Sequence, residues 1–140
     1  MKLPYGEDVG HYWDTSRTSP EEWIAKARKL IEGHGGKVTG EGFGDSEGRA
    51  AYLVAFCLGE DSFRVVWPVL PSSTGKDMMA RRQAATMLYH DIKAKLMTAS
   101  VLGNRAAFFS YLLLPDGRQA VSVAVPELVE AFPKMLLAGD

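Results

Sequence analysis

The spacing of apolar positions changes along the chain, and these changes predict its elements. The longest helical pattern covers residues 76–99, where apolar residues recur on one arc at about 100° per residue. This arc is predicted to face a core, and it consists of Met78, Ala85, Leu88, Ile92, Leu96 and Ala99. The opposite arc is predicted to be exposed, and it carries Arg82, Thr86, His90, Lys93 and Met97. Thr74 is the predicted N-cap, with Ser72 and Ser73 as competing candidates, and Gly103-Asn104 is the predicted end.

A shorter helix is predicted to begin at Ser19-Pro20-Glu21-Glu22. A capping hydroxyl, a proline at the first helical position and a glutamate at the third all favour a helix start there. Glycine at position 33, followed by Gly35-Gly36, predicts its end. The buried face of this helix is predicted to be Trp23, Ile24, Ala27, Leu30 and Ile31.

Between residues 37 and 70 the apolar period becomes two, which indicates strands. Residues 38–43 form a weak, glycine-rich strand, and residues 49–58 are apolar on both faces, as expected of a central strand. A third strand follows the turn at residues 59–61, with Phe63, Val65 and Trp67 on one face and Arg64 on the other. Pro68 and Pro71 place the end of this strand at an edge or terminate it, because proline cannot donate to a ladder.

The last part of the chain carries weaker signals. Residues 105–114 fit a short helix or a strand, and we favour helix to about residue 112. Alternating valines at 121, 123 and 125 predict a short strand, and residues 126–132 a final helix with proline at its start. The predicted fold is α+β: an antiparallel sheet of about three strands covered on one face by two helices, in the order α-β-β-β-α. It divides into an N-terminal arm (1–18), a core (19–102) and a C-terminal extension (103–140) packed on the same domain.

Composition narrows the class of protein. A length of 140 residues suits one domain. The formal charge of −1 excludes a strongly basic chain, although local basic patches remain compatible with it. No apolar run reaches the roughly 20 residues of a membrane span, and the first residues lack a signal-peptide pattern. We therefore expect a cytoplasmic protein without membrane contact. The single cysteine, Cys57, cannot form an intrachain disulfide.

No residue cluster predicts a reaction. Gly75-Lys76 invites comparison with a phosphate-binding loop, but Leu70 and Asp77 occupy positions where that loop needs glycine and a hydroxyl. No serine lies in a Gly-x-Ser-x-Gly elbow. The three histidines, His11, His34 and His90, are too far apart in the sequence to show the spacing of a zinc site. We expect no catalytic residue, metal or cofactor. An enzyme with an active site that cannot be recognised from the sequence remains an alternative.

Basic and aromatic side chains supply the candidate binding site. It consists of Arg64, Trp67, Lys76, Arg81, Arg82, Tyr89 and Lys93. If these residues lie on one surface, the cations would contact phosphates and Trp67 or Tyr89 would stack on bases. The simplest alternative is a solvated helix face. Another is an interaction protein or inhibitor that binds a host protein through Trp13, Met79 and Met97, and the oligomeric state is open.

The order helix, three strands, helix over residues 20–99 resembles the double-stranded-RNA-binding domain, a layout related to the core of some single-strand annealing recombinases. Lys76-Asp77 and the run Ala-Arg-Arg-Gln-Ala-Ala at 80–85 are similar to the start of that domain's last helix. The resemblance implies that Lys76, Arg81 and Arg82 contact phosphates.

Residues 89–96 and 109–118 resemble a family of uncharacterised small proteins of tailed phages and prophages. That resemblance implies a setting in the host cytoplasm and no particular activity. Together the two resemblances and the basic strip predict a non-catalytic, nucleic-acid-binding accessory protein of phage origin. Whether it would bind DNA or RNA, single or double strands, is left open.

Overall fold

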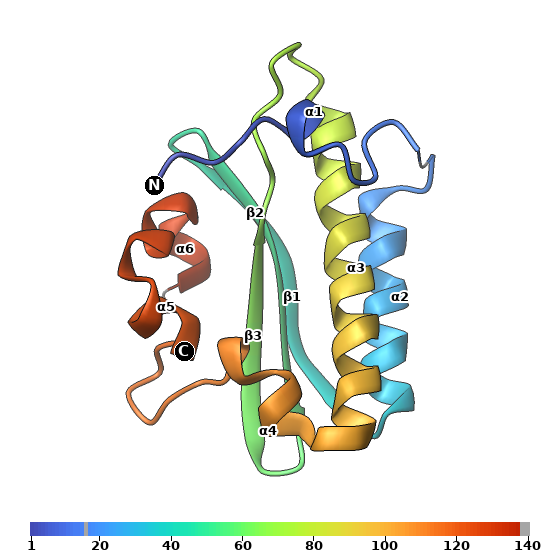
Figure 1. Ribbon diagram of the computed structural model, residues 1–140, viewed down its shortest axis with the longest axis vertical. Coiled ribbons are helices and arrows are strands. Elements are labelled where there is room, and N and C mark those ends of the chain that lie inside the picture. The colour runs from blue at the N-terminus through green and yellow to red at the C-terminus, as the bar shows by residue number, and fades with distance from the viewer. Residues whose placement is uncertain (16, 138–140) are drawn as a thin grey trace.

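A three-stranded antiparallel sheet forms the middle layer of the molecule. The structure is a computed structural model that describes residues 1–15 and 17–137. The strands β1 (Lys37–Ser46), β2 (Arg49–Leu58) and β3 (Asp61–Pro68) lie side by side in chain order. Helices α2 (Pro20–Gly33) and α3 (Asp77–Leu102) cover one face, and the segments from α5 (Ala120–Ala124) to α6 (Lys134–Leu137) lie on the other (Figure 1). The predicted α+β class, the three antiparallel strands and the two covering helices are confirmed.

The strand in the centre of the sheet is β2, as its two apolar faces predicted. It joins β1 through a two-residue turn, Glu47-Gly48, in which both residues have positive φ, as a tight hairpin turn requires. The outer edge of β3 is partly covered, because Phe63 bridges to Leu112 and the N–H of Leu113 donates to the carbonyl of Ser62. The outer edge of β1 has no such cover among the described residues.

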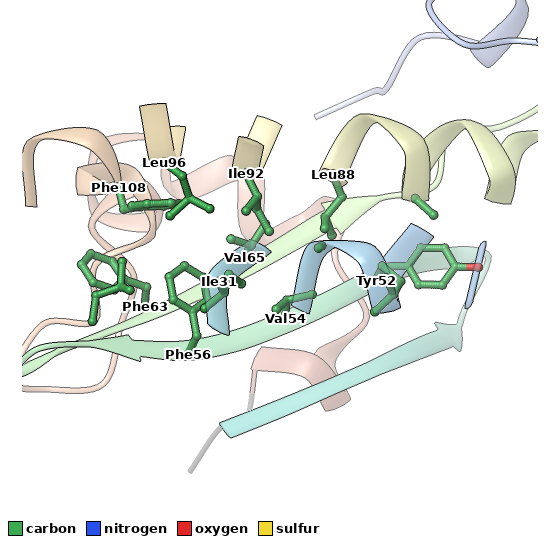
Figure 2. Close-up of a cluster of buried hydrophobic side chains, with 14 of the residues drawn as sticks. Ile31, Tyr52, Val54, Phe56, Phe63, Val65, Leu88, Ile92, Leu96 and Phe108 are labelled. Carbon is green, nitrogen blue, oxygen red and sulfur yellow. The ribbon is translucent and has the colours of Figure 1, made fainter. Parts of the chain in front are cut away.

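The main core lies between the sheet and the two helices. Alternate residues of β2 point towards α2 and α3, and the aromatic rings of Phe56, Phe63 and Phe108 meet at one end of this core (Figure 2). A smaller core on the opposite face joins Ala51 and Val66 to C-terminal residues Ala131 and Phe132. Both faces of β2 therefore pack against apolar groups.

The start of α2 is capped as its sequence predicted. The Ser19 hydroxyl accepts a hydrogen bond from the backbone N–H of Glu22 at 3.2 Å, and Pro20 is the first helical residue. After the helix, Gly36 approaches the core so closely that a Cβ there would lie 2.7 Å from side-chain atoms of both Ile31 and Leu58. Glycine is therefore required at this point for steric reasons.

The predicted cap of α3 is wrong. The N-cap position is Lys76, and the hydroxyl of Thr74 donates to the carboxylate of Glu7 at 2.6 Å. Glu7 belongs to the short helix α1 (Gly6–Val9), and also accepts from the N–H groups of Ser73 and Thr74 and from the Ser72 hydroxyl. The loop between β3 and α3 thus uses its polar groups to hold the N-terminal arm.

Two predictions for side chains of α3 are wrong, and the packing of the arm and α2 along the helix explains the first of them. Gln83 donates to the carbonyls of Gly6 and His11, both at 3.0 Å, so the arm lies along the first half of α3. Thr86, predicted to be exposed, is buried, and its hydroxyl is satisfied by the backbone carbonyl of Arg82. Met78, predicted to be buried, is exposed in the first turn of the helix.

The C-terminal extension continues as short helical segments: α4 (Asn104–Ala107), η1 (Phe109–Tyr111), α5 (Ala120–Ala124), η2 (Pro126–Ala131) and α6 (Lys134–Leu137). The favoured helical structure up to about residue 112 is confirmed, and the predicted final helix is a 3-10 helix with Pro126 at its start. The predicted strand at 121–125 is wrong, because these residues form α5. A strand needs a partner edge, and Leu112 and Leu113 already pair with the outer edge of β3. The described part of the chain holds no helix with the length and apolar character that crossing a membrane requires.

Candidate functional site

The seven residues of the predicted basic strip do not share one surface. Arg64 lies on the face of β3 opposite to the helices, because its neighbours Phe63 and Val65 belong to the helix-side core. Its side chain is only 7% exposed, and Nη2 donates to the carbonyl of Gly117 at 3.3 Å. The Arg64 carbonyl accepts a hydrogen bond from Gln119. The strand and the long helix therefore contribute no common cationic surface.

The guanidinium of Arg81 is already engaged within the molecule. Its Nε donates to the hydroxyl of Tyr52 at 3.0 Å, and Nη2 lies 3.7 Å from a carboxylate oxygen of Glu21. The planar group also lies over the ring of Phe43, 4.2 Å from its centre. Burial raises the pKa of Tyr52, although the hydrogen bond from Arg81 opposes that shift. Arg81 therefore organises the sheet edge and offers little free charge to a polyanion.

The other predicted residues lie apart from Arg64. Trp67 is half-buried against the main core, and Lys76 is exposed before α3. Arg82 is half-buried, and its Nε is buried without a hydrogen-bond partner. Of the seven, Tyr89 and Lys93 come closest to the predicted combination of a cation and a stacking ring, because both lie next to His90 on the helix layer.

We call the aromatic cluster around His90 the outer helix patch. Tyr12 stacks on His90 with ring centres 4.8 Å apart, and Trp23 contacts both Tyr89 and His90. Lys26 lies over the Trp23 ring at 4.5 Å. Burial lowers the pKa of His90, and the charge of Lys93 lowers it further. The outer helix patch is thus defined as Tyr12, Trp23, Lys26, Tyr89, His90 and Lys93.

A groove that the sequence did not indicate lies between α2 and β1. It has a volume of about 390 Å³. Ile24 and Ala25 of α2 form one side, and Phe43 and Tyr52 of the sheet form another. The remaining lining residues are Glu21, Arg28, Glu41 and Gly42. Phe43 remains 37% exposed, so an aromatic ring is available to a ligand in this groove.

The free edge of β1 borders the groove. In a two-residue hairpin the flanking pair, here Ser46 and Arg49, is hydrogen-bonded, and bonded and non-bonded pairs alternate from there. This alternation directs the backbone groups of Glu41, Phe43 and Asp45 away from β2. The residue opposite Asp45 on β2, Ala50, shows the same alternation. Its carbonyl points away from β1 and accepts a hydrogen bond from the N–H of Val69 at 2.8 Å.

A hint of this edge is present in the sequence. Residues 40–45 alternate glycine with larger residues, which is unusual for a strand that must pack on both faces. Gly42 has open space where a Cβ would be. Whether such a strand lies at an edge depends on the topology, however, and the pattern alone cannot show which groups remain unpaired.

No metal centre is formed within the described ranges, where no group of three or more histidine, cysteine, aspartate or glutamate side chains is placed to hold an ion. Comparison of the chain with protein-family models, curated proteins and solved structures finds no match. Function must therefore be argued from the groove, the free strand edge and the outer helix patch.

Proposed function

We propose that this protein is an interaction module that binds an extended segment of another protein. The segment adds a fourth strand at the outer edge of β1 and places an apolar side chain in the groove beside α2. The observation that carries this proposal is the outer edge of β1, which no described residue pairs with, directly beside an apolar groove. Strand addition of this kind obtains affinity from main-chain hydrogen bonds and selectivity from side-chain pockets.

The backbone chemistry favours this mode of binding. Glu41, Phe43 and Asp45 each direct one N–H and one C=O outward, so the edge offers an incoming strand a regular row of donors and acceptors. Each hydrogen bond would contribute about 0.5–1.5 kcal/mol net. Natural edges are often protected by proline, lysine or a bulge. Here the bulge lies at one end, between Val38 and Gly40, and leaves the stretch beside the groove regular.

The groove suits one or two apolar side chains. Its volume of about 390 Å³ is within the range of specific ligand sites, and its apolar walls come from rigid elements. Ile24 is part of the main core, so α2 cannot move away without disrupting that core. The peptide would therefore meet a preformed site, which reduces the entropic cost of binding.

Selection from a library of random peptides of about ten residues, the upper end of common strand lengths, tests the proposal. We expect enrichment on the wild-type protein and a loss of binding to Glu41→Pro, because proline removes an outward N–H and its ring blocks the incoming strand. Glu41→Ala is the matched control, since it removes the same side chain but keeps the N–H. Equal binding to both variants, with both folded by circular dichroism, would contradict strand addition at β1.

The outer helix patch favours a second candidate function, the binding of nucleic acid. Lys26 and Lys93 flank stacked aromatic rings, and such sites bind single strands through phosphate contacts and base stacking. We expect the slope of log affinity against log salt to fall by about 2 in the double variant Lys26→Glu and Lys93→Glu, measured between about 50 and 200 mM salt.

The matched control for this second candidate is the double variant Lys37→Glu and Lys134→Glu, which makes the same charge change away from the outer helix patch. Duplex and single-stranded DNA and RNA serve as probes. Binding that is absent, insensitive to salt, or equally weakened in both double variants would rule out this surface.

A further inference from the structure

The side chains beside the free edge of β1 point to the chemistry of the segment that it binds. Glu41, Phe43 and Asp45 pair with Val54, Tyr52 and Ala50. Tyr52 and Val54 belong to the helix-side core, so all three β1 side chains lie on the face that α2 covers. An added strand would place its own side chains on this face at every second position, directly opposite them.

Two of these three positions have their partners within the chain. Glu41 forms an ion pair with Arg28 of α2. The Phe43 ring contacts the Tyr52 ring, with centres 4.9 Å apart, and the guanidinium of Arg81, which also donates to the Tyr52 hydroxyl. Neither position therefore presents an uncompensated charge to an incoming strand, and Phe43 presents an apolar surface.

Asp45 differs from Glu41. Its side chain is exposed and forms no ion pair with another described residue. The nearest cation along the hairpin, Arg49, pairs with Ser46 and so lies on the opposite face of the sheet, where it acts on Glu130. Asp45 also lines a second hollow of about 740 Å³ together with Phe43 and the cationic residues Lys2, Arg49 and Arg81, none of which forms an ion pair with it.

We infer that the bound segment carries a lysine or arginine two positions from its apolar anchor. The anchor lies opposite Phe43 and enters the groove, while the cation lies opposite Asp45. This inference rests on the proposed strand addition. Opposite charges that face each other across two strands favour pairing, and like charges disfavour it, by up to about fivefold each in affinity.

The test compares two synthetic peptides taken from the library selection, identical except for lysine or glutamate two positions from the anchor. Wild-type protein should bind the lysine peptide more tightly, by about 2- to 25-fold, and Asp45→Lys should reverse the preference. Glu127→Lys is the matched control, because it makes the same charge change at an exposed position in the C-terminal layer. It should keep the preference of the wild type.

The outcomes separate this inference from the proposed function. Reversal in Asp45→Lys alone supports the pairing of Asp45 with a cation. If wild type and Asp45→Lys bind both peptides equally, the inference is wrong while strand addition stands. If the library selection yields no peptide that binds the wild-type protein, both are wrong.

Discussion

Removal of the Phe108 ring is a direct test of how the C-terminal extension is held on the domain. Phe108 follows α4, is completely buried, and contacts the rings of Phe56 and Phe63 with centres 5.3 and 5.5 Å away (Figure 2). Those two rings belong to β2 and β3, so Phe108 joins the extension to the sheet. We expect Phe108→Ala to leave a cavity that the surrounding rigid elements cannot close.

The expected loss is about 4–5 kcal/mol of unfolding free energy. Replacement of a buried phenylalanine by alanine costs about 3–5 kcal/mol of unfolding free energy. The upper half of that range applies because two aromatic contacts are lost together with the apolar area. A domain of this size is stable by roughly 5–15 kcal/mol, so the variant should still fold but unfold at a much lower denaturant concentration.

Urea unfolding followed by tryptophan fluorescence measures this loss, provided that the slope of free energy against urea is unchanged. The neighbouring ring provides the control, because Phe109 is 61% exposed. Phe109→Ala should change stability by no more than about 0.5 kcal/mol. Equal effects of the two substitutions, or a loss below about 1 kcal/mol for Phe108→Ala, would show that the extension is not held to the sheet by this ring.

Three further predictions test local features. Ser19→Ala should cost about 1 kcal/mol in urea unfolding, because it removes the hydroxyl that accepts from Glu22, and an unchanged stability would contradict that cap. Gly36→Ala should destabilise by about 1–3 kcal/mol, since the new Cβ overlaps Ile31 and Leu58, and a gain in stability would refute the close approach. Burial opposes the lowering of the Glu7 pKa, but hydrogen bonds from Thr74, Ser72 and the loop N–H groups outweigh it and lower the pKa to about 2. Because the folded pKa lies below the ordinary 4.5, this stabilisation is present above pH 4.5 and is lost as the pH falls towards 2. The melting temperatures of wild type and Glu7→Gln should therefore converge over that interval, and a constant difference down to pH 2 would contradict it.

The parts of the fold that sequence predicted are those governed by local chemistry. The cap at Ser19, the turn before β3 and the two apolar faces of β2 each depend on a few adjacent residues. The failures depend on what covers an element. Thr86 is buried because the arm and α2 pack along α3, and residues 121–125 are helical because no sheet edge is free beside them.

The candidate site shows the same division. The alternation in β3 predicts that Arg64 and Phe63 lie on opposite faces of the sheet. Arg64 could share a surface with α3 only if the helices covered the Arg64 face. The helices instead cover the Phe63 face, where the ring of Phe63 is completely buried. The groove was missed because an unpaired strand edge results from the whole topology and from no residue of β1 alone.

Backbone amide exchange, measured with and without bound peptide, reports whether an extended segment pairs with the outer edge of β1 as proposed. With a library-selected peptide bound, the amides of Glu41, Phe43 and Asp45 should exchange more slowly, because their N–H groups would gain partners. The amides of Gly42 and Gly44 already face β2 and should change little. If the peptide binds but leaves the amides of Glu41, Phe43 and Asp45 unprotected, or protects only amides of α3, the segment does not pair with β1.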